Sequence, residues 1–149
     1  DSTARSRLNG NSIYGKLSIK DKIKKVKKES SDSYSSNSNP TKCETSDDYL
    51  WLLSCGEIWD NGYNNGITRG RAIATEGKQY KYYKMNLGST NFDSSNDITK
   101  KPSTSNSDLW WLRSPSYTHS GHFCRVRSYG YCGSGLATTY YGVAPGFSI

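Results

Sequence analysis

Four cysteines are the residues whose chemistry could be most specific in this sequence: Cys43, Cys55, Cys124 and Cys132. If all were oxidised they would allow three disulfide pairings, and their spacing fits neither a Cys-x-x-Cys redox motif nor a zinc ribbon. The two histidines, His119 and His122, lie in a stretch rich in Ser and Gly and lack the further ligands of a structural zinc site. The sequence therefore predicts no metal site and no cofactor.

A pair of thiols could still serve an oxidoreductase or a cofactor-modifying enzyme, with Cys124 and Cys132 as the reactive groups. A nucleophilic cysteine needs a neighbouring base or a positive charge that lowers its pKa. Neither cysteine stands in a motif that indicates such activation. We predict that the chain is not an enzyme and keep the thiol enzyme as an alternative.

Binding chemistry is concentrated in the C-terminal third, where residues 117–141 mix Tyr and Arg with Ser, Gly and Thr. Residues 114–149 contain no Asn, Lys, Asp or Glu, although residues 1–113 contain 11 Asn. Tyr offers a large contact area with few rotatable bonds, Arg adds charge-assisted hydrogen bonds, and Ser and Gly adapt around them, as in antibody paratopes. The expected anchors are Tyr117, Arg125, Arg127, Tyr129, Tyr131, Tyr140 and Tyr141.

A short aromatic strand is expected to support this surface. Trp110 and Trp111 should point to opposite faces of it, so one fills the core and the other covers the base of the binding face, with the core the safer assignment for both. Arg113 is expected to pair with a carboxylate such as Glu57 or to hold loop carbonyls. Alternation along 123–129 puts Phe123 on the side of Arg125 unless a bulge intervenes.

The other elements follow from local patterns. Ser54 and Glu57 form a capping box that should open a short helix after a buried strand at residues 49–53. A turn near Ser2 should bury Leu8. Residues 30–46 are polar and predict a mobile surface loop, and residues 63–108 predict mostly loop, with 80–84 the clearest patterned piece.

Charge is concentrated at the N-terminus. The net charge is +7, and residues 1–30 contribute +6 of it, from 9 Lys and Arg against 3 Asp and Glu. Ile19, Ile23 and Val26 recur at helical spacing among lysines, which predicts a basic helix over residues 16–28. A solvated helix face is favoured over a nucleic-acid site, because lysines without Arg or interleaved aromatic residues do not hold a nucleic acid in a defined position.

Composition limits the class of protein. A chain of 149 residues fits one domain, and 13% aromatic residues argue against disorder although only 33% are hydrophobic. No apolar run is long enough to span a membrane, and no apolar block follows the basic N-terminus as in a signal peptide. The chain starts without a methionine, so we expect it to be part of a larger protein.

Several motifs together resemble one family. Residues 50–54 read LWLLS with Glu57 close behind, residues 110–115 read WWLRSP, Phe123 precedes Cys124, and residues 142–147 read GVAPGF. This combination is similar to bacterial and phage modules with the C-type lectin fold, above all the variable proteins of diversity-generating retroelements. The resemblance spans most of the chain.

The resemblance implies a single α+β domain over residues 1–149, with a C-type lectin-like fold of short helices, small antiparallel sheets and much loop. It implies a ligand-binding display domain whose variable region, about residues 117–141, is diversified at template adenines to recognise macromolecular targets of the host or phage receptor type. AA-type Asn codons cannot yield Lys, Glu, Gln, Met or Trp, and residues 117–141 contain none of these. Display would be extracellular, on a bacterial surface or a phage virion.

Site residues follow from the same resemblance. The expected variable, ligand-binding residues are Tyr117, His119, Ser120, His122, Arg125, Arg127, Tyr129, Tyr131, Gly133, Ser134, Thr138, Tyr140 and Tyr141. The expected scaffold residues are Trp110, Trp111, Arg113, Phe123, Pro145 and Phe147. Calcium-dependent sugar binding is disfavoured because the Glu-Pro-Asn, Gln-Pro-Asp and Trp-Asn-Asp motifs of sugar-binding lectins are missing. The alternatives are a fixed lectin-like module and a nucleic-acid-binding module using the basic helix.

Overall fold

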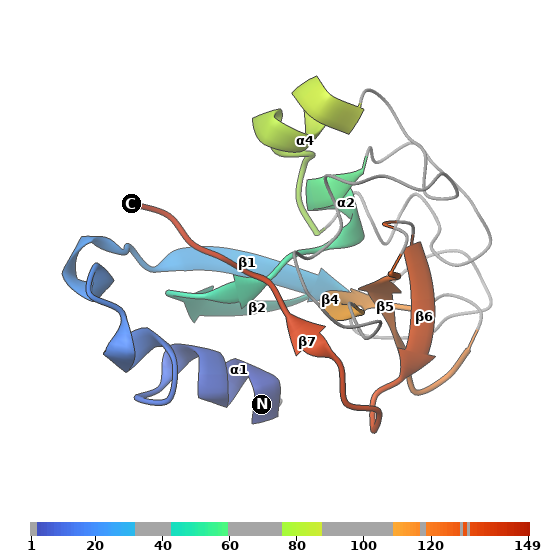
Figure 1. Cartoon of the computed structure of the whole chain (residues 1–149), viewed down its shortest axis with the longest axis horizontal. Coiled ribbons are helices and arrows are strands. Elements are labelled where there is room, and N and C mark those ends of the chain that lie inside the picture. The colour runs from blue at the N-terminus through green and yellow to red at the C-terminus, as the bar shows by residue number, and fades with distance from the viewer. Residues whose placement is uncertain are drawn as a thin grey trace.

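Short helices and small sheets alternate along the chain in the computed structural model (Figure 1). The structure describes residues 3–31, 43–59, 76–87, 109–116, 119–128, 130 and 132–149. The helices are α1 (Thr3–Asn9), α2 (Cys55–Ile58), α4 (Lys81–Leu87) and the 3-10 turns η1 (Tyr14–Lys16) and η2 (Lys20–Lys22). The strands are β1 (Val26–Ser31), β2 (Cys43–Asp48), β3 (Trp51–Leu52), β4 (Trp110–Pro115), β5 (His122–Val126), β6 (Cys132–Leu136), β7 (Gly142–Val143) and β8 (Pro145–Gly146). This mixture agrees with the predicted α+β class.

The helix α1 packs beside the start of β3 and buries Leu8, as predicted for the turn near Ser2. Leu8 is buried and forms a small core with Ile23 and Leu50. The Asn9 side chain accepts hydrogen bonds from the backbone N–H groups of Tyr49 (2.7 Å) and Leu50 (3.0 Å) and donates one to the Leu50 carbonyl (2.8 Å). Asn9 therefore fixes the helix to the chain that enters β3.

The predicted basic helix over residues 16–28 is wrong. The chain instead forms η1 and η2, and Val26 begins β1, which pairs with β2 in an antiparallel hairpin. A helix would have stacked Lys20, Lys24 and Lys28 four residues apart, where like charges repel. The hairpin places Lys27 opposite Asp47 instead, and opposite charges at facing positions of a strand pair are favourable.

The prediction of a loop over residues 30–46 is also wrong in part, because strands occupy both ends of this stretch. β1 extends to Ser31, and β2 already begins at Cys43. The register pairs Val26 with Asp48 and Ser31 with Cys43. Polar side chains suit a hairpin that has little to bury, because strand pairing satisfies the backbone. The centre of the stretch, residues 32–42, lies outside the described residues.

The capping box is confirmed at the start of α2. The Ser54 hydroxyl accepts from the Glu57 N–H (3.1 Å), and the Glu57 carboxylate accepts from the Ser54 N–H (3.0 Å). The helix ends at Ile58. The predicted buried strand before it is shorter than expected, since β3 spans only Trp51–Leu52. Within the predicted middle loop, residues 81–87 form the helix α4.

Four strands form the main sheet in the order β6-β5-β4-β7. β4 pairs antiparallel with β5, with a register shift between Trp111 and Pro115, and parallel with β7. β5 pairs antiparallel with β6 over five residue pairs, from His122–Leu136 to Val126–Cys132. Figure 1 shows β5 and β6 on the side of the molecule away from α1.

One face of this sheet packs on the main core. Its buried residues are Trp51, Leu53, Cys55, Ile58, Trp59, Trp110, Leu112, Cys124, Val126 and Cys132. Residues from β3, α2, β4, β5 and β6 thus share a single apolar layer, so the sheet is held against the first half of the chain. Among the described residues no helix is long and apolar enough to cross a membrane.

The buried carboxylate of Glu57 joins four segments. It accepts hydrogen bonds from Arg113 Nη1 (2.6 Å), Lys28 Nζ (2.8 Å) and Tyr80 Oη (2.6 Å). Arg113 also donates to the carbonyls of Leu52 (2.8 Å), Glu29 (3.0 Å) and Glu76. The predicted pairing of Arg113 with Glu57 is confirmed, and the predicted contact with loop carbonyls is confirmed at Glu76, whereas Leu52 and Glu29 lie in strands.

Replacing Glu57 by Gln should lower the free energy of unfolding by about 3–5 kcal/mol, because two cations then stay buried without an anion. Urea unfolding of the variant measures the loss. Glu29→Gln is the matched control, since Glu29 is an exposed carboxylate on β1, and it should change stability by no more than about 0.5 kcal/mol. Equal losses in the two variants would contradict the buried-pair account.

From the ion pairs of Glu57 we also predict that the protein loses stability in acid. Burial alone would raise the pKa of Glu57, but Arg113, Lys28 and Tyr80 outweigh it and the pKa lies below its ordinary value. Because the pKa of Glu57 is lower in the folded protein than in the unfolded chain, its ionisation stabilises the folded protein above the unfolded pKa of about 4.3. This contribution is lost as the pH falls through the folded pKa. Urea midpoints from pH 7 to pH 3 should therefore converge for the wild type and Glu57→Gln. A constant difference across that range would refute the assignment.

Candidate functional site

The face of the sheet opposite the core presents aromatic and basic side chains. We call this the outer face and define it by Trp111, Phe123, Arg125, Arg127 and Tyr141. Alternation along β5 creates it, because Cys124 and Val126 are fully buried whereas Phe123 is 39% exposed. The pairing of Trp111 with Arg125 continues the face onto β4.

Two glycines make β6 the floor of the outer face. Gly133 pairs with Arg125, and Gly135 pairs with Phe123. A Cβ at Gly133 would collide with Arg127 Nε, and one at Gly135 would lie 3.0 Å from the Tyr141 ring. The side chains of Arg127 and Tyr141 therefore lie flat across the β6 backbone, in space that any larger residue would take.

Arg125 is held in place at the centre of the outer face. Its Nε donates to the Ser134 carbonyl (2.9 Å), and its guanidinium lies 4.6 Å from the centre of the Tyr141 ring. The Tyr141 ring in turn packs on Trp111 with ring centres 4.7 Å apart. A cation over an aromatic face contributes about 0.5–1 kcal/mol at exposed sites. The arrangement presents the guanidinium and two rings with little side-chain freedom left to lose on binding.

Turns at two ends of the sheet extend the exposed surface. His119 and His122 stack with ring centres 5.0 Å apart around the β4–β5 turn, where Gly121 adopts a φ of +73°. Tyr140 follows β6 and is 98% exposed. A large aromatic side chain so exposed is an available contact group for a partner.

The structure brings together four of the ten predicted ligand-binding residues that it describes. Arg125, Arg127, Gly133 and Tyr141 meet on the outer face, and Ser120, Thr138 and Tyr140 are exposed in turns. Ser134 does not join them, since it pairs with Cys124 and so lies on the opposite side of the sheet. Three further predicted residues, Tyr117, Tyr129 and Tyr131, lie outside the described residues.

The predicted scaffold residues divide between the two faces. Trp110 is buried in the core, and Trp111 is half-buried on the outer face, so the core assignment holds for only one tryptophan. Phe123 takes the exposed side that strict alternation predicts, although a scaffold role would suit a buried residue. Phe147 is 45% exposed. Pro145 is exposed on the short strand β8, an edge position that tolerates a missing N–H.

Two of the basic N-terminal residues that the structure describes line a pocket of mixed charge. A shallow pocket between α1 and β2 is lined by Arg5, Asn9, Lys25, Asp47 and Tyr49 among others. Its Arg5 is paired with the carboxylate of Asp48 at 2.8 Å. The pocket therefore has acidic as well as basic walls, and acidic groups oppose phosphate binding.

The thiols proposed for the alternative enzyme are deeply buried. Hydrogen bonds from the neighbouring thiols and burial hold the pKa of Cys124 well above its ordinary value. Cys132 is 1% exposed. A reactive cysteine is partly exposed and has a lowered pKa, and Cys124 has neither property.

A family model matches residues 1–149, the whole of the chain. The chain belongs to the family described as Domain of unknown function (DUF6273). No curated protein and no solved structure matches this DUF6273 chain.

Sequence reasoning missed two features of this DUF6273 domain. The glycine floor under Arg125 and Arg127 depends on the register of β5 with β6, which no local pattern reveals. The stacking of Tyr141 on Trp111 joins residues from different strands. A signal was present in Gly133 and Gly135, since alternating glycines in a strand indicate close approach of other groups.

Substitutions along β5 should change the free energy of unfolding by different amounts on the two faces of the sheet. Phe123→Ser and Arg125→Ser are expected to lower the free energy of unfolding by no more than about 1 kcal/mol, since surface residues contribute little. Val126→Ala should cost about 2 kcal/mol or more because it leaves a cavity in the core. Urea unfolding of the three variants gives the comparison. A loss at Arg125 as large as the loss at Val126 would show that the outer face is part of the folding core.

Proposed function

We propose that this DUF6273 chain is a ligand-binding display domain with a C-type lectin-like fold, whose outer face recognises macromolecular targets, most simply proteins. The observation that carries the proposal is the outer face itself, with Arg125, Arg127, Trp111 and Tyr141 held across a glycine floor. Trp, Tyr and Arg are the residue types that dominate binding energy at protein interfaces.

Rigidity of the support favours such a role. The opposite face of the same strands packs on the main core through Trp110, Cys124 and Val126. Binding residues are best placed on rigid elements whose own positions are fixed by packing. Substitution on the outer face leaves these buried residues in place, so different ligands could be selected on one scaffold.

We further propose that a retroelement diversifies this surface and that the domain acts outside the cell, on a bacterial surface or a phage. The residues 119–141 that the structure describes support this, because Arg125, Arg127, Thr138, Tyr140 and Tyr141 are all types that mutated Asn codons yield. They lie at exposed or half-buried positions, while the interleaved Cys124 and Val126 are buried.

Sequencing of the encoding locus tests the diversification. We expect a near-identical template repeat beside a reverse-transcriptase gene, with mismatches only at template adenines. These mismatches should fall on the codons for Arg125, Arg127, Tyr140 and Tyr141. Absence of any repeat would refute diversification and leave a fixed binder.

A display selection tests the binding surface itself. One library varies Arg125, Arg127, Tyr140 and Tyr141 on the complete chain. A matched library varies four exposed residues away from the outer face, Lys20, Lys22, Lys27 and Thr45. Both are selected against the same panel of folded proteins. The first library should yield binders with dissociation constants of about 1 μM or tighter, equivalent to about −8 kcal/mol. Equal yields from both libraries would contradict the proposal.

A further inference from the structure

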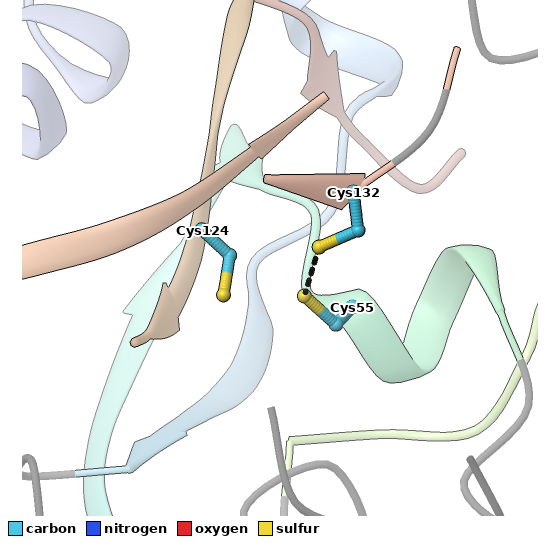
Figure 2. Close-up of side chains that lie close together, drawn as sticks. All are labelled: Cys55, Cys124 and Cys132. Atoms are coloured by element: carbon cyan, nitrogen blue, oxygen red, sulfur yellow. Dashed lines mark hydrogen bonds between the residues drawn. The ribbon is translucent and has the colours of Figure 1, made fainter. Parts of the chain in front are cut away.

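Three cysteines from three different elements converge beneath the sheet. Cys55 opens α2, Cys124 lies in the middle of β5, and Cys132 begins β6. Their sulfur atoms all lie within 4.8 Å of one another, and Cys55 Sγ is 3.9 Å from Cys132 Sγ. Figure 2 shows the three thiol groups directed into one space between α2 and the strands.

The cluster is unusual for cysteines that only fill space. A single buried cysteine behaves as a small hydrophobic residue, but here three thiols of the same apolar core also lie close to one another. None of the three is joined in a disulfide, and none is more than 1% exposed. The arrangement thus combines soft donor atoms from chain positions up to 77 residues apart.

We propose that Cys55, Cys124 and Cys132 together bind one thiophilic metal ion, and that this ion is Zn²⁺. Thiolate sulfur is the donor that Zn²⁺ and Cu⁺ prefer in proteins. Two thiolates on a tetrahedral zinc ion at about 2.3 Å lie about 3.8 Å apart. The Cys55–Cys132 pair already has nearly this separation at 3.9 Å.

Charge favours the divalent ion. Binding releases the three thiol protons to solvent, so three thiolates and one Zn²⁺ leave a net charge of −1 in the core. One Cu⁺ would leave −2. Because an uncompensated charge in an apolar interior is costly, the core around Cys124 should hold zinc in preference to copper.

The position of the ion indicates a structural role. It would join α2 to β5 and β6 directly under Arg125, which lies next to Cys124 on the other face. A structural zinc site contributes its binding energy to folding. The inference is independent of the proposed binding function, since a fixed scaffold of any function could use it.

The test uses the complete chain, purified under reducing conditions and freed of metal. Addition of Zn²⁺ should give one ion per chain by native mass spectrometry. At a hundredfold excess over the dissociation constant, it should raise the melting temperature by roughly 5–10 °C. Co²⁺ in its place should give an intense sulfur-to-cobalt charge-transfer band, and the intensity of its visible bands reports the coordination number.

Variants identify the ligands. Cys124→Ala and Cys124→Val should each remove the charge-transfer band and the zinc-dependent rise in melting temperature, and the Val variant keeps the core filled if Ala does not fold. Cys43→Ala is the matched control and should retain one ion. The proposal would be overturned if the reduced chain took up no zinc, or if zinc uptake were unchanged in the Cys124 variants. It would also be overturned if only Cys43→Ala lost the ion, or if the chain bound stoichiometric Cu⁺ and excluded zinc.

Discussion

The buried carboxylate of Glu57 is the constraint on which the arrangement of the other elements depends. A buried charge requires partners, and this one obtains them from β1 through Lys28, from β4 through Arg113 and from the segment before α4 through Tyr80. Each partner brings further contacts, since Arg113 also binds three backbone carbonyls. Because the buried carboxylate of Glu57 needs Arg113 as a partner, it fixes the position of β4. The position of β4 in turn fixes the sheet that presents the outer face.

Where side chains satisfy the backbone locally, the sequence predicted the structure. The capping box needs only Ser54 and Glu57 three residues apart, and its helix formed as expected. The pairing of Arg113 with Glu57 was one of two roles predicted for it, because its fork of donors suits either a carboxylate or backbone carbonyls. Strict alternation along β5 puts Phe123 on the side of Arg125, and the structure has this arrangement, with Phe123 39% exposed.

Features that depend on partners distant in the sequence could not be predicted in this way. The spacing of Ile19, Ile23 and Val26 fits a helix, but strand pairing with β2 decided the conformation of Val26. The cysteines gave no metal motif because their convergence is a product of the fold, with Cys55 and Cys132 in elements far apart along the chain. The outer face was predictable in its residue types and not in its geometry.

The C-terminal strands also have a consequence for the order of folding in the cell. β7 pairs with β4, β8 pairs with β3, and Ser148 bridges Lys24. Residues 142–148 therefore complete three separate parts of the structure that are synthesised much earlier. The nascent chain can form its hairpin and short helices during translation, but these parts can close only after residues 142–148 leave the ribosome, so the final assembly is a late event of biosynthesis.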